Sequence, residues 1–208
     1  MYTNTLKLNN GVEIPQLGLG TWFIDDDKVA DAVKAAVEIG YRHIDTAQAY
    51  GNERGVGEGV RTCGIPREEL FVVSKVAAEH KTYEDAARSI NETLEKMGLD
   101  YLDMMIIHSP QPWVEVNQSE NRYVEGNRAA WKALEDAYKA GKLKAIGVSN
   151  FQIEDIESLM ETANKDHMKT NADVDFEISA EDMEILKNFK KIENYGANSE
   201  FPVYGGKL

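Results

Sequence analysis

The spacing of apolar residues along the chain changes repeatedly between a period of two and a period close to four. Apolar and polar residues alternate over 6–14, on both sides of Asn10 and Gly11, and this pattern around an Asn-Gly pair predicts a β-hairpin. Beyond it, short apolar runs predict strands. We expect these strands at 17–22, 42–46, 70–76, 102–107 and 143–148.

Segments with an apolar residue at every third or fourth position follow the strands and predict helices. Gly40, Gly98 and Gly141 come directly after three of these segments, where a glycine commonly ends a helix. Thr82 and Asp85 resemble a capping box, with aspartate in place of glutamate, at the start of one helix. The helices are expected at 29–39, 52–63, 82–97, 122–140 and 152–163.

The alternation of strand and helix, repeated about five times, predicts a parallel α/β protein whose apolar strands are buried on both faces. After residue 163 the rhythm breaks, because a polar stretch is followed by a predicted helix from Ser179 to about Ile192 and by a tail. We expect one domain over 1–208, with 1–163 and 164–208 as its two portions. An open parallel sheet leaves unpaired edges, so we expect a homo-oligomer or C-terminal elements to cover them.

Composition narrows the classes of partner. The net charge of −13 argues against binding nucleic acid or an anionic membrane through a basic surface. No apolar run approaches the roughly 18 residues of a membrane span, and the first residues lack the features of a signal peptide, so we expect a cytoplasmic protein. The single cysteine, Cys63, excludes an internal disulfide and offers no metal-ligand cluster.

Polar side chains stand at the ends of successive predicted strands: Asp45, Lys75, His108 and the pair Ser149-Asn150. Taken singly, each has an ordinary explanation, such as a cap, a solvated strand end or a structural histidine. Their coincidence points to chemistry, because the carboxyl ends of parallel strands meet at one edge, where α/β barrels place their active sites. Tyr50 follows Asp45 in the adjoining loop; its ordinary alternative is a half-buried loop aromatic.

Two segments carry a resemblance to a known family. Residues 40–47, Gly-Tyr-Arg-His-Ile-Asp-Thr-Ala, with Glu53, Val56 and Gly57 at their spacing, and residues 147–151, Gly-Val-Ser-Asn-Phe, resemble signatures of the aldo-keto reductases. This resemblance implies a (β/α)8 barrel of the TIM type and NADP(H)-dependent reduction of aldehydes and ketones to alcohols, with NAD(H) as a second cofactor choice. It implies a small-molecule carbonyl substrate and no metal.

The resemblance also implies a catalytic tetrad of Asp45, Tyr50, Lys75 and His108. Tyr50 is the expected proton donor to the carbonyl oxygen that receives the hydride. Lys75 is expected to favour the phenolate of Tyr50 and so lower its pKa. Asp45 is expected to hold Lys75, and His108 to orient the substrate oxygen.

Further positions match cofactor-binding residues of the family. The resemblance assigns Ser149 and Asn150 to the nicotinamide carboxamide, although both also suit the cap of the following helix. It assigns His167 and Asn171 to the adenosine 2′-phosphate, although by themselves they would pass as an ordinary polar loop. Glu161 stands where a phosphate-binding lysine is expected.

Trp22 and Trp113 match the aromatic walls of the substrate pocket, and simple packing is the alternative for both.

The chain is shorter than a full barrel. A (β/α)8 barrel typically takes about 250 residues, whereas this chain has 208 and about five βα units before the polar stretch. We therefore expect an incomplete barrel that lacks the later strands and part of the cofactor site. This leaves a second hypothesis, a weakly active or inactive derivative that serves as a binding or assembly protein.

Overall fold

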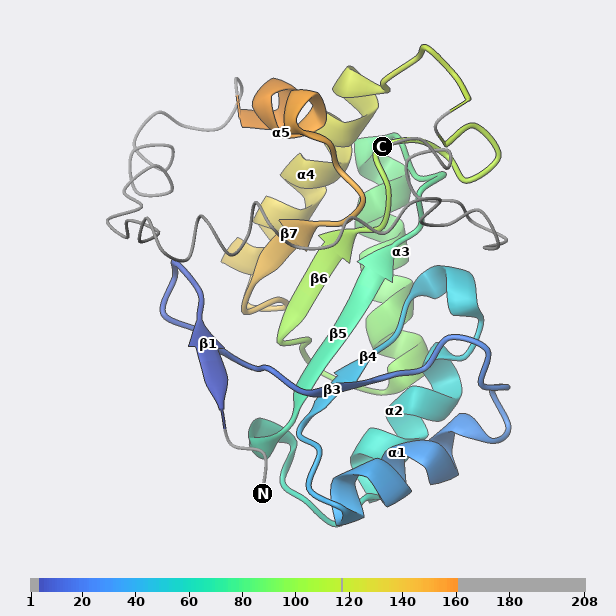
Figure 1. Cartoon of the computed structure of the whole chain (residues 1–208), viewed down its shortest axis with the longest axis vertical. Helices are drawn as coiled ribbons and strands as arrows, with labels where there is room; N and C mark the ends of the chain where they lie inside the picture. Colours follow the sequence, from blue (N-terminus) through green and yellow to red (C-terminus); the bar gives the residue numbers. More distant parts are fainter. Residues whose placement is uncertain (1–3, 117, 161–208) are drawn as a thin grey trace, which may run out of the picture.

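A parallel sheet with its strands in sequence order is the centre of the structure, a computed structural model that describes residues 4–116 and 118–160. Each strand pairs with the next along the chain, so the connections between them are βαβ crossovers (Figure 1). The five strands are β3 (Gly18–Gly20), β4 (His43–Asp45), β5 (Phe71–Val76), β6 (Met104–Ile107) and β7 (Ile146–Val148). The described part is therefore an α/β fold that forms an incomplete barrel, as predicted.

The predicted N-terminal hairpin is confirmed. Strands β1 (Thr5–Lys7) and β2 (Glu13–Pro15) pair antiparallel, with Leu6 opposite Ile14. Gly11, in the connecting turn, has a φ of 84°, which a glycine adopts without steric strain. Asn10 links the turn to the segment before β7, because its Nδ2 donates to the carbonyl oxygen of Lys144 over 2.9 Å.

The described helices cover one side of the sheet (Figure 1), and consecutive helices from α1 to α4 pack against each other. Thr82 caps α3 as expected: its Oγ1 accepts from the Asp85 N–H over 3.1 Å, and Gly98 ends the helix with a φ of 61°. The helices are α1 (Val29–Glu38), α2 (Glu53–Thr62), α3 (Tyr83–Met97), α4 (Val124–Lys139) and α5 (Ile153–Met160), with short 3-10 turns at Gln48–Tyr50 and Arg67–Glu69.

The hydrophobic core lies between these helices and the sheet. Val33 of α1 and Val56 of α2 belong to this core, and Ile44, Met105 and Leu134 are fully buried with them. The expectation that every strand is buried on both faces holds only for β5. In β4 and β6 buried residues alternate with half-buried ones, and β7 is half-buried throughout. The reason is that the described helices cover a single face, so side chains on the opposite face keep some exposure.

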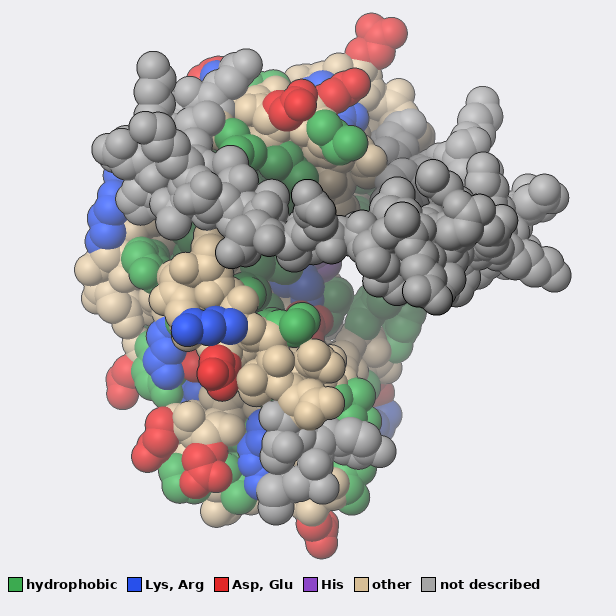
Figure 2. All heavy atoms as spheres, turned by 60° about the vertical axis from the view of Figure 1, so that its left-hand side comes forward, with side chains coloured by type: hydrophobic (Ala, Val, Ile, Leu, Met, Phe, Trp, Pro, Cys, Tyr) green, Lys and Arg blue, Asp and Glu red, His purple; other side chains and the backbone are tan. Residues whose placement is uncertain are grey.

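Several expectations about the second portion of the chain fall outside the described residues. These include the helix predicted from Ser179 and the whole of 164–208, so the single domain over 1–208 remains a prediction. Within the described ranges, no helix is both long and apolar enough to cross a membrane. In the view of Figure 2, acidic side chains lie at both the upper and the lower end of the described surface.

Close contact between α2 and α3 requires a glycine at position 57. A Cβ placed on Gly57 would lie 2.2 Å from the carbonyl oxygen and 2.4 Å from the Cα of Met97. Both atoms belong to the backbone of α3, so the conflict cannot be relieved by a side-chain rotation. Gly57 is therefore a packing requirement of the fold.

We predict that Gly57→Ala lowers the free energy of unfolding by at least about 1–3 kcal/mol, since α2 and α3 must separate to admit the methyl group. Helix propensity alone would favour alanine by about 1 kcal/mol, so the sign of the change separates the two effects. Urea unfolding measures it. Gly20→Ala is the control, because a Cβ there meets no described atom within 4 Å. A Gly57→Ala variant as stable as the parent would refute the packing argument.

Candidate active site

The register of three parallel strands brings three predicted site residues to one edge of the sheet. Asp45 is the last residue of β4, Lys75 is next to last in β5, and His108 directly follows β6. Asp45 is in register with Val73, and Lys75 with Ile106. Because the strands are parallel, their carboxyl ends meet, as the sequence predicted.

Lys75 carries a buried charge that is held from the end of β4. Its side chain is almost fully buried, and its Nζ donates to Asp45 Oδ1 over 2.6 Å and to the carbonyl oxygen of Thr46 over 2.8 Å. Burial lowers the pKa of Lys75, and the attraction of Asp45 opposes that shift. The predicted pairing of Asp45 with Lys75 is therefore present in the structure.

Tyr50 lies against this ion pair at the end of the 3-10 turn that follows β4. The Nζ of Lys75 is 5.0 Å from the centroid of the Tyr50 ring. Burial, followed by the negative charge of Asp45, raises the pKa of Tyr50 to about 12. The net shift of the Tyr50 pKa is therefore upward, because desolvation of the phenolate and repulsion by the Asp45 carboxylate dominate. That Lys75 favours the phenolate stays a prediction.

His108 completes the group on the other side of Tyr50. The two rings meet edge to face, with centroids 5.6 Å apart and an interplanar angle of 74°. Burial, and secondarily the charge of Lys75, lowers the pKa of His108 to about 4, so its imidazole is neutral at pH 7. Within the described residues its buried Nδ1 has no hydrogen-bond partner.

Both predicted wall tryptophans lie in the same row of aromatic rings. Trp22 stacks on Tyr50 with centroids 6.1 Å apart and planes at 21°, and Trp113 meets His108 edge to face with centroids 4.9 Å apart. Trp22 is 47% exposed, so its ring can offer a surface to a ligand. The row therefore runs Trp22, Tyr50, His108, Trp113, with the two candidate proton-handling groups between the tryptophans.

Ser149 and Asn150 follow β7 at the same edge of the sheet. Asn150 Nδ2 donates to the carbonyl oxygen of His108 over 2.8 Å and lies 3.1 Å from Ser149 Oγ. The sequence also suggested that Ser149 and Asn150 cap α5. The hydrogen bond observed at the start of this helix instead uses Asp155, whose Oδ2 accepts from the Gln152 N–H over 2.9 Å. The other two predicted cofactor residues, His167 and Asn171, lie outside the described residues.

Two buttressing residues were not found from the sequence. Asn52 is buried: its Nδ2 donates to the carbonyl oxygens of Thr21 and Ile24 over 2.8 and 2.9 Å, which fixes the loop around Trp22. Glu79 Oε1 accepts from the backbone N–H of Trp113 over 3.2 Å. The only feature of the sequence that could have indicated Asn52 is its place as a polar residue in the turn after Tyr50. Nothing in the sequence pattern indicates a role for Glu79.

Comparison with known proteins agrees with this arrangement. Residues 16–194 match the model of the aldo/keto reductase family. The chain belongs to this family. It is 44% identical over 161 residues to the glyoxal reductase of Bacillus subtilis, and the match covers 77% of this chain and 54% of that protein. It is 40% identical over 157 residues to the methylglyoxal reductase of Escherichia coli, covering 75% and 52% respectively.

Solved structures of other aldo/keto reductases share the fold. An aldo/keto reductase from Brucella melitensis superposes with a TM-score of 0.70 at 39% identity, covering 77% of this chain and 59% of that one. A Bombyx mori enzyme in complex with NADP superposes with a TM-score of 0.67 at 34% identity, covering 78% and 55%. The chain thus spans about half the length of the curated relatives it matches.

We predict that His108 stays neutral down to a pH of about 4. Since the unfolded chain binds a proton near pH 6.5, it binds more protons than the folded chain between these values, so stability falls as the pH drops from about 6.5 to 4. The loss due to His108 is on the order of 3 kcal/mol. Unfolding measured across this range should show a shallower decline for His108→Gln than for the parent.

Titration of the imidazole resonances by NMR assigns the pKa directly. A His108 that titrates near 6.5 in the folded chain would contradict the burial argument.

Proposed function

We propose that this chain is an NADP(H)-dependent oxidoreductase that reduces aldehydes or ketones to alcohols. The observation that carries the proposal is the contact of Lys75 with Asp45 beneath the ring of Tyr50, with His108 on the other side of that ring. Such a group can deliver a proton to an oxygen that becomes negatively charged, which is what carbonyl reduction requires.

Tyr50 is the proton donor in this proposal. A pKa raised to about 12 keeps its phenol protonated at neutral pH, so a proton is available for transfer. The phenolate left behind is attracted by the ammonium of Lys75, 5.0 Å from the ring centroid. Asp45 keeps this ammonium in place, and it thereby acts on Tyr50 through Lys75.

His108 orients the substrate. Its neutral imidazole has one N–H donor and one acceptor nitrogen, so it can donate a hydrogen bond to a carbonyl oxygen without holding a competing charge. The edge-to-face contacts with Tyr50 and Trp113 limit rotation of the ring. A carbonyl oxygen held by His108 would lie where the Tyr50 hydroxyl can also reach it.

The donor set at the end of β7 suits a nicotinamide. A carboxamide offers one carbonyl acceptor and one amino donor, and the Ser149 hydroxyl with the Asn150 amide can pair with both. When bound, NADP(H) supplies the hydride. The Bombyx mori relative bound to NADP supports the choice of cofactor, with NAD(H) as the second choice. His167 and Asn171 remain predictions for the 2′-phosphate.

The substrate in this proposal is a small-molecule carbonyl compound flanked by Trp22 and Trp113. Relatives named glyoxal reductase and methylglyoxal reductase make these two dicarbonyl compounds suitable first probes. A cytoplasmic location also remains a prediction.

We predict that NADPH quenches the tryptophan fluorescence of the chain with saturation in the micromolar range, worth about 8 kcal/mol of binding. Tyr50→Phe should lower NADPH-dependent reduction of methylglyoxal by at least about 100-fold, because the proton donor is lost, while NADPH binding stays within about twofold. Calorimetry and absorbance at the nicotinamide band measure the two quantities.

Tyr138→Phe, on the exposed face of α4, is the matched control and should leave both values unchanged. Activity that survives Tyr50→Phe would remove this residue from the proposed role. An absence of binding up to millimolar NADPH and NADH would favour the second hypothesis, in which the protein serves in binding or assembly.

We further propose that a second copy, or the C-terminal portion of the chain, covers the edges of the sheet. Among the described strands, β3 pairs only with β4, and β7 only with β6. Two open parallel edges would promote association. We predict a solution mass of at least twice the 23.3 kDa of one chain by light scattering. A 23.3 kDa species with amides of β3 and β7 protected from hydrogen exchange would instead assign the cover to the C-terminal portion.

A further inference from the structure

The segment between β6 and α4 carries Trp113 to its contact with His108. It starts at Ser109 and ends at Tyr123, so it is a long connection, and its described residues form no helix or strand. A long loop needs hydrogen bonds and packing to keep a single conformation. Gln111, within the segment, donates from Nε2 to the carbonyl oxygens of Ser119 and Asn121, and side chains outside the segment supply the further contacts that place Trp113.

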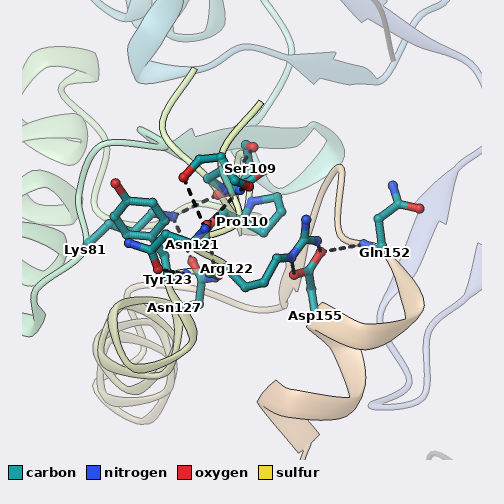
Figure 3. Close-up of polar contacts among 11 residues, drawn as sticks. Lys81, Ser109, Pro110, Asn121, Arg122, Tyr123, Asn127, Gln152 and Asp155 are labelled. Carbon is teal, nitrogen blue, oxygen red and sulfur yellow. Dashed lines mark hydrogen bonds and ion pairs between the residues drawn. The ribbon is translucent and has the colours of Figure 1, made fainter. Parts of the chain in front are cut away.

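Lys81, from the loop before α3, binds the beginning of the segment. Its Nζ donates to the carbonyl oxygen of Ser109 over 3.0 Å and to Asn127 Oδ1 over 2.8 Å (Figure 3). Asn127, on α4, donates in turn from Nδ2 to the carbonyl oxygens of Pro110 over 3.0 Å and Arg122 over 3.2 Å. The Lys81–Asn127 pair thus joins the two ends of the segment to each other.

The packing around Lys81 leaves little room for another arrangement. A Cβ placed on Gly126 would lie 2.8 Å from the Cβ and 2.9 Å from the carbonyl oxygen of Lys81, so only glycine allows α4 to approach this closely. Asn127 is buried at 4% exposure. Burial lowers the pKa of Lys81 to about 8, while Glu79 and Asp155 act in the opposite direction. Buried polar groups of this kind are costly to leave unpaired, which favours one geometry.

Two further contacts hold the middle and the far end. Glu79, two residues before Lys81, accepts from the backbone N–H of Trp113 itself. Arg122 forms a two-pronged ion pair with Asp155 of α5, with Nε 3.0 Å from Oδ1 (Figure 3). The segment is therefore bound at its beginning, at the tryptophan and at its end, and two of these contacts come from the loop that contains Glu79 and Lys81.

We propose that Lys81, together with Asn127, and Glu79 are positioning residues that set the place of Trp113 against His108 and hence the width of the substrate pocket. Among the described residues, their hydrogen bonds go to the segment that carries Trp113 and not to Tyr50 or the ends of β4 and β7, so they act through Trp113. The part of this proposal that concerns the pocket rests on the proposed carbonyl reductase function. The part that concerns the position of Trp113 does not.

The decisive test is 19F NMR of the full chain labelled with 5-fluorotryptophan, which contains three tryptophans. Substitution of each tryptophan by phenylalanine assigns the resonances. Lys81→Met should shift or broaden the Trp113 resonance, whereas Lys132→Met should leave it in place. Lys132 is a matched control because it lies exposed on α4 in an ion pair with Asp136. An unchanged Trp113 resonance in Lys81→Met would overturn the proposal.

Glu79→Ala provides a second variant that does not disturb the buried pair. Glu79 is exposed, so its removal deletes the contact to the Trp113 N–H without opening the core. It should also move the Trp113 resonance, while Glu84→Ala, in the exposed first turn of α3, should not. If Lys81→Met does not fold, as judged by circular dichroism, an unchanged resonance in Glu79→Ala overturns the proposal by itself.

Kinetics then test the pocket. In Lys81→Met the KM for an aromatic aldehyde should rise about tenfold relative to that for methylglyoxal, since a wide substrate needs the tryptophan wall more than a narrow one. NADPH binding and kcat for methylglyoxal should stay within about twofold. An equal change for all substrates and for NADPH would indicate a merely structural role. A chain that reduces no aldehyde would refute the proposed function, while the 19F result would still decide the position of Trp113.

Discussion

The buried ammonium of Lys75 is the constraint on which the geometry of the candidate site depends. A charge removed from water must find partners. Lys75 donates to two acceptors at the end of β4, the carboxylate of Asp45 and the carbonyl oxygen of Thr46. A slip of β5 by one residue would turn Lys75 to the opposite face of the sheet, toward the helices, and separate it from both. The ion pair therefore fixes the register of two strands as well as the electrostatics beside Tyr50.

Much of this arrangement could be predicted from local sequence. The Asn10-Gly11 pair predicts its hairpin because the turn conformation is set by those two residues. Thr82 and Gly98 mark the ends of α3 for equally local reasons. The meeting of Asp45, Lys75 and His108 follows from one rule of topology, that adjacent parallel strands end at the same edge, and needs only correct strand ends. Family resemblance added the roles, which geometry alone does not assign.

What could not be predicted depends on tertiary surroundings. The direction of the pKa shift of Tyr50 depends on how far the ring is buried and on whether Asp45 or Lys75 acts on it more strongly, and the sequence contains neither quantity. The contacts of Asn52, Glu79 and Lys81 join loops that follow different strands, and no spacing rule links such positions. The half-buried face of β6 was missed because an apolar strand does not reveal how many of its faces are covered.

In the described part of the barrel, the candidate proton-handling residues and Trp113 are held by different kinds of element. The proton-handling group is held by strands, since Asp45 and Lys75 lie on β4 and β5, and strand positions are fixed by register. Trp113 instead stands on a long connection, and side chains from the neighbouring loop, from α4 and from α5 hold that connection. Substitutions in that loop can therefore alter the shape of the pocket while the ion pair and Tyr50 keep their places. Under the proposed function, this division allows the chemistry of the site to stay constant while its choice of carbonyl compound changes.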